Sequence, residues 1–163
     1  MSLLGICEAI DGTAFSTSIR ESVWLFPILE TLHLLGIGVS AGTILFVDAR
    51  LLGIGMKRAR LSDVLEQLQP WTLGAFVMMG VTGTLLFLPE SVKCYHSVFF
   101  RVKAAMLLLA AVNALLFHWR IYPGVAAWDE SPRAPVRARL AGGISLTLWV
   151  GIIAMGRAIA YGR

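Results

Sequence analysis

A glutamate and a histidine one helical turn apart interrupt a long apolar stretch of the sequence. Glu30 and His33 lie within segment 22–47, which is otherwise apolar enough to cross a bilayer. Residues three apart share a helix face, so the carboxylate can orient the imidazole. Ionisable groups inside a membrane are costly and often mark a functional site. His33 lies about ten residues into its helix and is expected near mid-membrane, at about 1.5 Å per residue.

An imidazole at that depth can ligate haem or a metal, pass protons, or simply hydrogen-bond to a neighbouring helix. The E-x-x-H pattern occurs once, whereas di-iron bundles need it twice, which argues against a di-iron site. His96 and His118 are expected at other depths, so a bis-histidine haem is not predicted. Met79 and Met106 are expected near the depth of His33, as second ligands of a haem or as packing residues.

Basic and amide side chains are candidates to complete the polar cluster. Lys103 and Arg101 open the third apolar segment, on the same side of the membrane as the start of the first. We expect Lys103 to pair with Glu30 and Arg101 to snorkel to the surface. Asn113 is expected to hydrogen-bond to another helix, and Arg157 to anchor the interface.

The composition identifies the elements that must position these groups. Of the 163 residues, 57% are hydrophobic and 15% charged, whereas soluble domains are about 45–50% apolar and about 25% charged. The chain is therefore predicted to be an all-α integral membrane protein in a lipid bilayer, a single four-helix transmembrane bundle. An N-terminal surface helix is expected over residues 1–10. The expected spans are 22–47, 70–88, 98–118 and 140–160.

Local signals predict where these helices begin, bend and pack. The S-x-x-E pattern of Ser18 and Glu21 has the form of a capping box and predicts the start of the first long helix. Pro27 predicts a bend just before Glu30. The small residues from Gly38 to Gly42 predict a face that another helix approaches closely. Segment 48–69 is expected to be a hydrophilic loop with a short surface helix, and the second span to open at Pro70.

The basic residues predict the orientation of the chain. Segments 48–69 and 119–139 hold four lysines and arginines each, against six elsewhere. Because cytoplasmic loops are enriched in such residues, both termini are expected outside, periplasmic in a bacterial inner membrane. The net charge of +4 is interpreted as topology, not as a nucleic-acid surface. Cys7 and Cys94 form no CxxC motif. Their thiols are expected to be free, and a disulfide is the alternative if both lie on one side of the membrane.

Two stretches resemble known families. Residues 30–36 (ETLHLLG) and 100–113 (FRVKAAMLLLAAVN) are similar to a bacterial family of short, uncharacterised inner-membrane proteins, with a first-helix histidine, a Thr82-Gly83 pair and a lysine opening the third helix. More remotely, the chain resembles the CopD-type copper-resistance domain and the HemJ-type protoporphyrinogen oxidase. HemJ-type proteins are associated with haem b, and the resemblance implies that His33 and Lys103 are the residues to carry over.

Three functions follow as hypotheses, and whether the protein is an enzyme is left open. The leading one is haem b binding or redox chemistry, with His33 as axial ligand, Glu30 and Lys103 setting its environment, and Met79 or Met106 as second ligand. The alternative is copper or proton transport of CopD type, with Met79, Met106 and His33 as soft or titrating sites. The third is a structural subunit. A membrane redox partner or a homo-oligomer would fit any of these. Catalytic triads, phosphate loops and nucleotide fingerprints are absent from the sequence.

Overall fold

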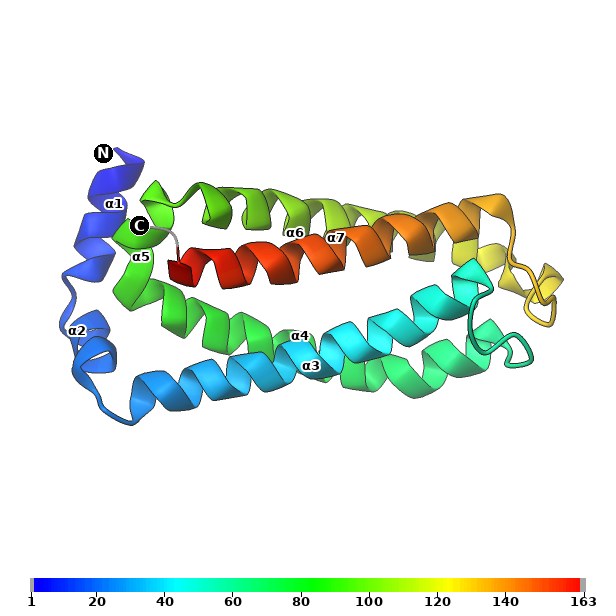
Figure 1. Ribbon diagram of the computed structural model, residues 1–163, viewed down its shortest axis with the longest axis horizontal. Helices are drawn as coiled ribbons and strands as arrows, with labels where there is room; N and C mark the ends of the chain where they lie inside the picture. Colours follow the sequence, from blue (N-terminus) through cyan, green and yellow to red (C-terminus); the bar gives the residue numbers. More distant parts are fainter. Residues whose placement is uncertain (1, 162–163) are drawn as a thin grey trace.

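Four long helices form the body of the protein, and short helices cover one end of it (Figure 1). The computed structural model describes residues 2–161, and no strand occurs among them. The long helices are α3 (Leu25–Leu52), α4 (Leu61–Phe87), α6 (Val98–Leu116) and α7 (Val136–Tyr161). The shorter elements are α1 (Leu3–Asp11), α2 (Ala14–Glu21), η1 (Leu88–Glu90), α5 (Ser91–His96), η2 (Phe117–Ile121) and η3 (Tyr122–Ala127).

The long helices have the length and the surface of membrane spans. In the described residues, four helical stretches are long and apolar enough to cross a membrane. Their large side chains point outward; Leu108 and Val77, for example, are each 68% exposed, and α6 buries no residue at all. Exposed apolar surface on this scale is unfavourable in water and expected in lipid. The prediction of an all-α membrane protein is confirmed.

The bundle is built from two helix pairs. Helix α3 packs along α4, α6 packs along α7, and α3 also contacts α7, so that α7 lies between α3 and α6 (Figure 1). Two aromatic stacks bridge the pairs: Phe76 with Trp149, and Phe87 with Phe100, each with ring centroids 5.6 Å apart. The predicted interhelical bond of Asn113 is confirmed, because its Nδ2 donates to the carbonyl of Ala141 at 3.0 Å.

The close approach of α3 and α4 occurs at Gly36 and Ser40. A Cβ on Gly36 would lie 2.7 Å from Cγ of Met79, so only glycine fits there. The predicted face from Gly38 to Gly42 is wrong in register, since nothing lies within 4 Å of a Cβ on either glycine. Gly36 and Ser40 are themselves four residues apart and both buried. They form the small-residue face instead.

The predicted start of the first long helix is wrong. Ser18 and Glu21 belong to α2, whose N-cap is Thr13. Helix α3 begins at Leu25, where the Ser22 hydroxyl accepts the amide of Leu25 at 3.0 Å. Pro27 is therefore in the first turn of α3, where a missing N–H leaves no bond unmade. Pro27 therefore gives no reason to expect a bend in α3 at Glu30.

The predicted first loop is also wrong, because α3 and α4 continue through most of it. Helix α3 extends to Leu52 and stops at Gly53, whose φ of +73° is a left-handed cap that glycine favours. Helix α4 already begins at Leu61, with Pro70 inside it. A helix satisfies its own backbone bonds, so it can run beyond the apolar core. The third helix begins at the predicted residue and its α-helical part ends at Leu116, while the fourth runs from Val136 to Tyr161.

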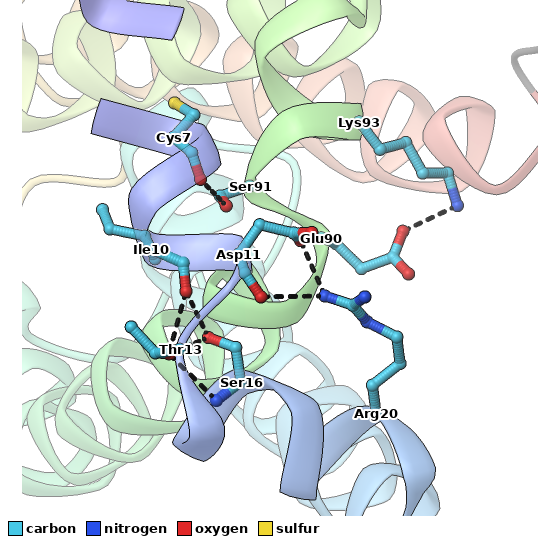
Figure 2. A network of polar contacts seen from close by, with 9 residues as sticks. All are labelled: Cys7, Ile10, Asp11, Thr13, Ser16, Arg20, Glu90, Ser91 and Lys93. Carbon is cyan, nitrogen blue, oxygen red and sulfur yellow. Dashed lines mark hydrogen bonds and ion pairs between the residues drawn. The ribbon is translucent and has the colours of Figure 1, made fainter. Parts of the chain in front are cut away.

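The N-terminal helices close one end of the bundle. Helix α1 packs on α5 and η1, and α2 also contacts η1. Figure 2 shows the polar contacts that hold them: Ser91 donates to the carbonyl of Cys7 at 2.9 Å, and Arg20 pairs with Asp11 at 2.8 Å. The expected N-terminal helix is thus present and rests on the bundle. Cys7 and Cys94 lie in the two packed helices, α1 and α5, and both are free thiols.

Candidate functional site

The imidazole of His33 is held by a hydroxyl from the neighbouring helix. Nδ1 of His33 lies 2.9 Å from Oγ1 of Thr82 on α4. Thr82 is itself buried, with only 4% of its surface exposed. Thr82 also donates its hydroxyl hydrogen to the carbonyl of Met78 at 2.7 Å. One contact therefore fixes the orientation of the ring relative to the α3–α4 interface.

The hydroxyl of Thr82 has one hydrogen, and its bond to the Met78 carbonyl favours one tautomer of His33. With that hydrogen on the Met78 carbonyl, the hydroxyl oxygen can only accept at its contact with His33, so Nδ1 carries the ring proton. In the neutral ring the lone pair is then on Nε2. This is the nitrogen that a haem iron or a metal would bind, or that would accept a proton.

Gly83 gives the ring its place on α4. A Cβ on Gly83 would lie 3.0 Å from Cε1 of His33, closer than such contacts normally are. The Thr82-Gly83 pair therefore has a physical role: one residue binds the imidazole and the next leaves room for it. The sequence contains both residues, but only the pairing of α3 with α4 shows that they face His33.

Lys103 belongs to the other helix pair, α6 and α7. It packs on α7, where a Cβ on Gly156 would lie 3.6 Å from its Nζ. Among the ion pairs of residues 2–161, none includes Lys103. Lys103 thus presents an ammonium group without an ion-pair partner at the α6–α7 interface.

The predicted ion pair between Glu30 and Lys103 is not formed. Glu30 is exposed on α3, and its side chain forms no hydrogen bond or ion pair within the described part of the chain. The reason is the order of the helices: α6 packs on α7, and α7 separates it from α3. Arg101, on α6, is exposed, as snorkelling requires, and Arg157 stacks on Tyr161 near the end of α7, with 5.8 Å from Cζ to the ring centroid.

Met79 and Met106 lie in different helix interfaces. Met79 packs on Gly36, and its sulfur accepts a weak hydrogen bond from Ser40 at 3.7 Å. Met106 packs over Gly151 of α7, in the other pair. Both methionines fill the space that a glycine leaves, which is a packing role. Ligation by either stays a prediction.

The other histidines lie away from this site. His96 ends α5 and is exposed, whereas His118 is exposed in η2, beyond the far end of α6, with Nδ1 2.9 Å from the carbonyl of Ala114. Within residues 2–161, no cluster of three histidine, cysteine or acidic side chains is arranged to hold a metal ion. Any cofactor at His33 would therefore have one imidazole ligand from this chain.

A second buried polar cluster, at the opposite end of the bundle, was missed by the sequence analysis. Arg50 is 0% exposed, and its guanidinium donates to the carbonyls of Ala59 at 2.7 Å, Asp129 at 2.9 Å and Ser131 at 3.0 Å. It thereby ties the loop after α3 to the loop before α7. Its position next to the apolar run of the first helix was the available signal, but the residue had been assigned to a hydrophilic loop.

Asp129 completes this cluster by capping α4. Its carboxylate accepts the backbone amide of Ser62 at 2.9 Å and also the Ser62 hydroxyl, and it pairs with Arg60 at 3.3 Å. Burial alone would raise the pKa of Asp129, but the bonds from Ser62 and Leu61 and the charge of Arg60 together hold that pKa below its usual value. The carboxylate is therefore ionised where it caps the helix.

Asp48 is the other buried acid that was assigned to the first loop. It lies on α3 with 3% of its surface exposed, and its Oδ2 has no hydrogen-bond partner. The interior of the bundle thus carries ionisable groups near both of its ends, around His33 and around Asp48.

Comparison with known proteins places the chain in a family but assigns no chemistry to it. No curated protein and no solved structure gives a significant match, so the resemblance to CopD- and HemJ-type proteins has no support beyond the motifs themselves. The model of one family matches residues 23–162, which include all four long helices and leave out α1 and α2. The chain belongs to this family, a family of unknown function (DUF6644).

Proposed function

We propose that the protein binds haem b in the membrane, with Nε2 of His33 as the axial ligand. The observation that carries the proposal is the contact between His33 and Thr82, which orients the imidazole and leaves Nε2 with its lone pair. Histidine ligands of metals characteristically donate their other ring nitrogen to an oxygen in this way. Bound haem b would supply a one-electron redox centre.

The other residues of the site suit this ligand. Gly83 leaves room beside the ring of His33. Lys103 presents an ammonium group without an ion-pair partner, which can meet a haem propionate. Glu30, being exposed on α3, would act on the site only from its edge. The proposal needs no second protein ligand for the haem iron. To become one, Met79 would have to move out of its packing against Gly36, or Met106 out of its packing against Gly151.

The test is an optical titration of the detergent-solubilised protein with haemin. The proposal predicts a Soret band that saturates at one haem per chain, in both the oxidised and the reduced states. Replacing Lys103 with Gln should weaken haem binding without abolishing the band, whereas Arg101→Gln, two residues away and exposed, is the matched control. Absence of a saturable band would overturn the proposal.

The alternative function is transport of protons or copper through the bundle. Three ionisable side chains in the interior favour the proton form: His33, Lys103 and Asp48, of which Asp48 has an unpartnered carboxylate oxygen. Such groups inside a membrane commonly mark proton pathways. Purified protein in liposomes, with a pH-sensitive dye inside, separates the two functions. Proton flux through haem-free protein that disappears in Asp48→Asn would favour proton transport. Copper bound to the purified protein would favour copper transport.

The proposal places the protein in a bacterial inner membrane with both termini in the periplasm. Helix α1 and the end of α7 lie at the same end of the bundle, as four spans require (Figure 1). The loops at the opposite end carry the larger share of lysine and arginine. Reporter fusions at the C-terminus and in the loop at Lys57 would test it. A redox partner or a second copy of the chain in the membrane would complete an electron path. If the protein is instead a structural subunit, His33→Ala should lower the yield of purified protein without removing a cofactor.

A further inference from the structure

Two cavities adjoin at the end of the bundle far from His33. One is a groove of about 680 Å³ along α7, and the other is a cavity of about 610 Å³ between the loop that follows α3 and the loop that precedes α7. Leu52 and Arg139 line both. Each has the volume of an ordinary ligand site, about 300–1,000 Å³. Because they share two lining residues, one ligand can occupy both.

The groove is apolar and the cavity is basic. Thr147 and Arg139 are the only polar side chains among the residues lining the groove, and the others are aliphatic or glycine. The cavity is lined by three cations: Lys57, Arg133 and Arg139. No carboxylate lines either space, and none of the three cations enters an ion pair within residues 2–161. Such a combination fits a ligand with an apolar tail and an anionic head.

The position of the two spaces matches that of a lipid in one leaflet. The cavity lies where the chain leaves the membrane, between the loop that follows α3 and the start of α7. The groove follows α7 from Val136 to Leu148, about 18 Å at 1.5 Å per residue. One leaflet of the apolar core is about 15 Å thick. The groove thus has the length of an acyl chain whose head would sit among the cations.

We propose that this composite site binds an anionic phospholipid, with the phosphate at Lys57, Arg133 and Arg139 and an acyl chain in the groove. Basic pockets at the cytoplasmic ends of transmembrane helices recognise acidic lipid headgroups in this manner. The site is independent of His33 and of the proposed haem. Two other occupants fit the site less well. A free phosphate would fill the basic cavity but not the apolar groove. A second copy of the chain would bring its own basic surface against Lys57, Arg133 and Arg139, and the like charges would repel.

The test is native mass spectrometry of the full chain in detergent, with phosphatidylglycerol and phosphatidylcholine of identical acyl chains added at equal concentration. We expect phosphatidylglycerol to bind preferentially and to saturate at one molecule per chain. Arg139→Gln and Arg133→Gln should each weaken its binding by about fivefold. Arg137→Gln is the matched control, because Arg137 is exposed between them and lines neither space. Equal binding of the two lipids, or an equal loss in the control, would overturn the proposal.

Two further measurements separate the lipid from other occupants. A Cβ on Gly143 has only Leu52 nearby, at 3.8 Å, so Gly143→Leu fills the groove, and it should lower phosphatidylglycerol binding while leaving the three cations in place. Gly74→Leu, at an open position on α4, is its control. If phosphatidylglycerol raises the thermal unfolding temperature of the protein and inorganic phosphate does not, the occupant of the site is the lipid. Equal stabilisation by phosphate alone, or a dimer that replaces the bound lipid, would contradict it.

Discussion

Nδ1 of His33 lies 2.9 Å from Oγ1 of Thr82 across the α3–α4 interface, while the Thr82 hydroxyl donates to the carbonyl of Met78 on its own helix. The two residues are 49 positions apart in the chain. Their contact determines both which ring nitrogen is free and how the ring is oriented. The proposed haem site depends on this pair more than on any other contact.

Replacing Thr82 with valine should weaken haem binding without removing the ligand. Valine keeps the shape of threonine but loses the oxygen that accepts from Nδ1. Substitution of such supporting groups typically costs about 10–100-fold in metal affinity. Haemin titration measures it, with Thr84→Val as control, because Thr84 is exposed and bonds only to the carbonyl of Gly80. Equal affinities in the two variants would show that Thr82 does not orient the ligand.

Replacing Arg50 with methionine should destabilise the fold, whatever the function. The guanidinium serves three backbone carbonyls in a site with no exposure, and each carbonyl left unsatisfied costs about 1–3 kcal/mol. We expect the free energy of unfolding in mixed detergent to fall by about 3 kcal/mol or more. Arg58→Met, an exposed position in the same loop, should change it by less than about 0.5 kcal/mol. A small effect of Arg50→Met would contradict its role in joining the loops.

The stabilisation contributed by Asp129 should depend on pH. Its pKa is lower in the folded protein than its usual value, which is about 4. The contribution is therefore complete above about pH 5 and is lost as the pH falls through about 4 toward the lower folded pKa. Asp129→Asn should be less stable than wild type at pH 7, and the difference should shrink below pH 4. Glu130→Gln, whose parent side chain is 80% exposed, is the control. A difference that does not vary with pH would contradict an ionised cap.

The register of the α3–α4 packing can be tested with two glycines of the same helix. Gly36→Ala would place a Cβ 2.7 Å from Cγ of Met79, and overpacking of this kind costs about 1–3 kcal/mol. Gly38→Ala meets nothing within 4 Å and should be neutral or slightly stabilising, by up to about 1 kcal/mol. Unfolding in detergent measures both. If Gly38→Ala proved the more damaging change, the observed register would be wrong.

The number and type of the spans could be predicted from the sequence, whereas their ends could not. Hydrophobic composition is sufficient to identify apolar helices, and Asn113 was predicted to bond between helices, as it does. The positions of Asp48 and Arg50 could not be predicted, because charged residues next to a span resemble loop residues until the packing of the helices and loops shows that they are buried. A hydropathy pattern also cannot distinguish a helix that stops at the membrane surface from one that continues beyond it, as α4 does before Pro70.

At the candidate site, the sequence identified the residues better than their partners. His33 contacts Thr82 of α4, whereas Lys103 packs on Gly156 of α7, so that their membership of one site stays a prediction. The pairing of Glu30 with Lys103 failed because α7, not α3, packs on α6, and the order of helices around a bundle is not encoded in the periodicity of any one of them. Likewise, Thr82 became a partner of His33 only through the register set by Gly36 and Ser40.

The most direct test of the haem site is the absorption spectrum of the purified protein after haem supplementation, compared between His33→Ala and His118→Ala. His118 is exposed and lies beyond the far end of α6, so its removal leaves the site intact. We predict a Soret band in wild type and His118→Ala, and its loss in folded His33→Ala. A band that persists in His33→Ala, or one that is absent from the wild type, would contradict the assignment of His33 as the ligand.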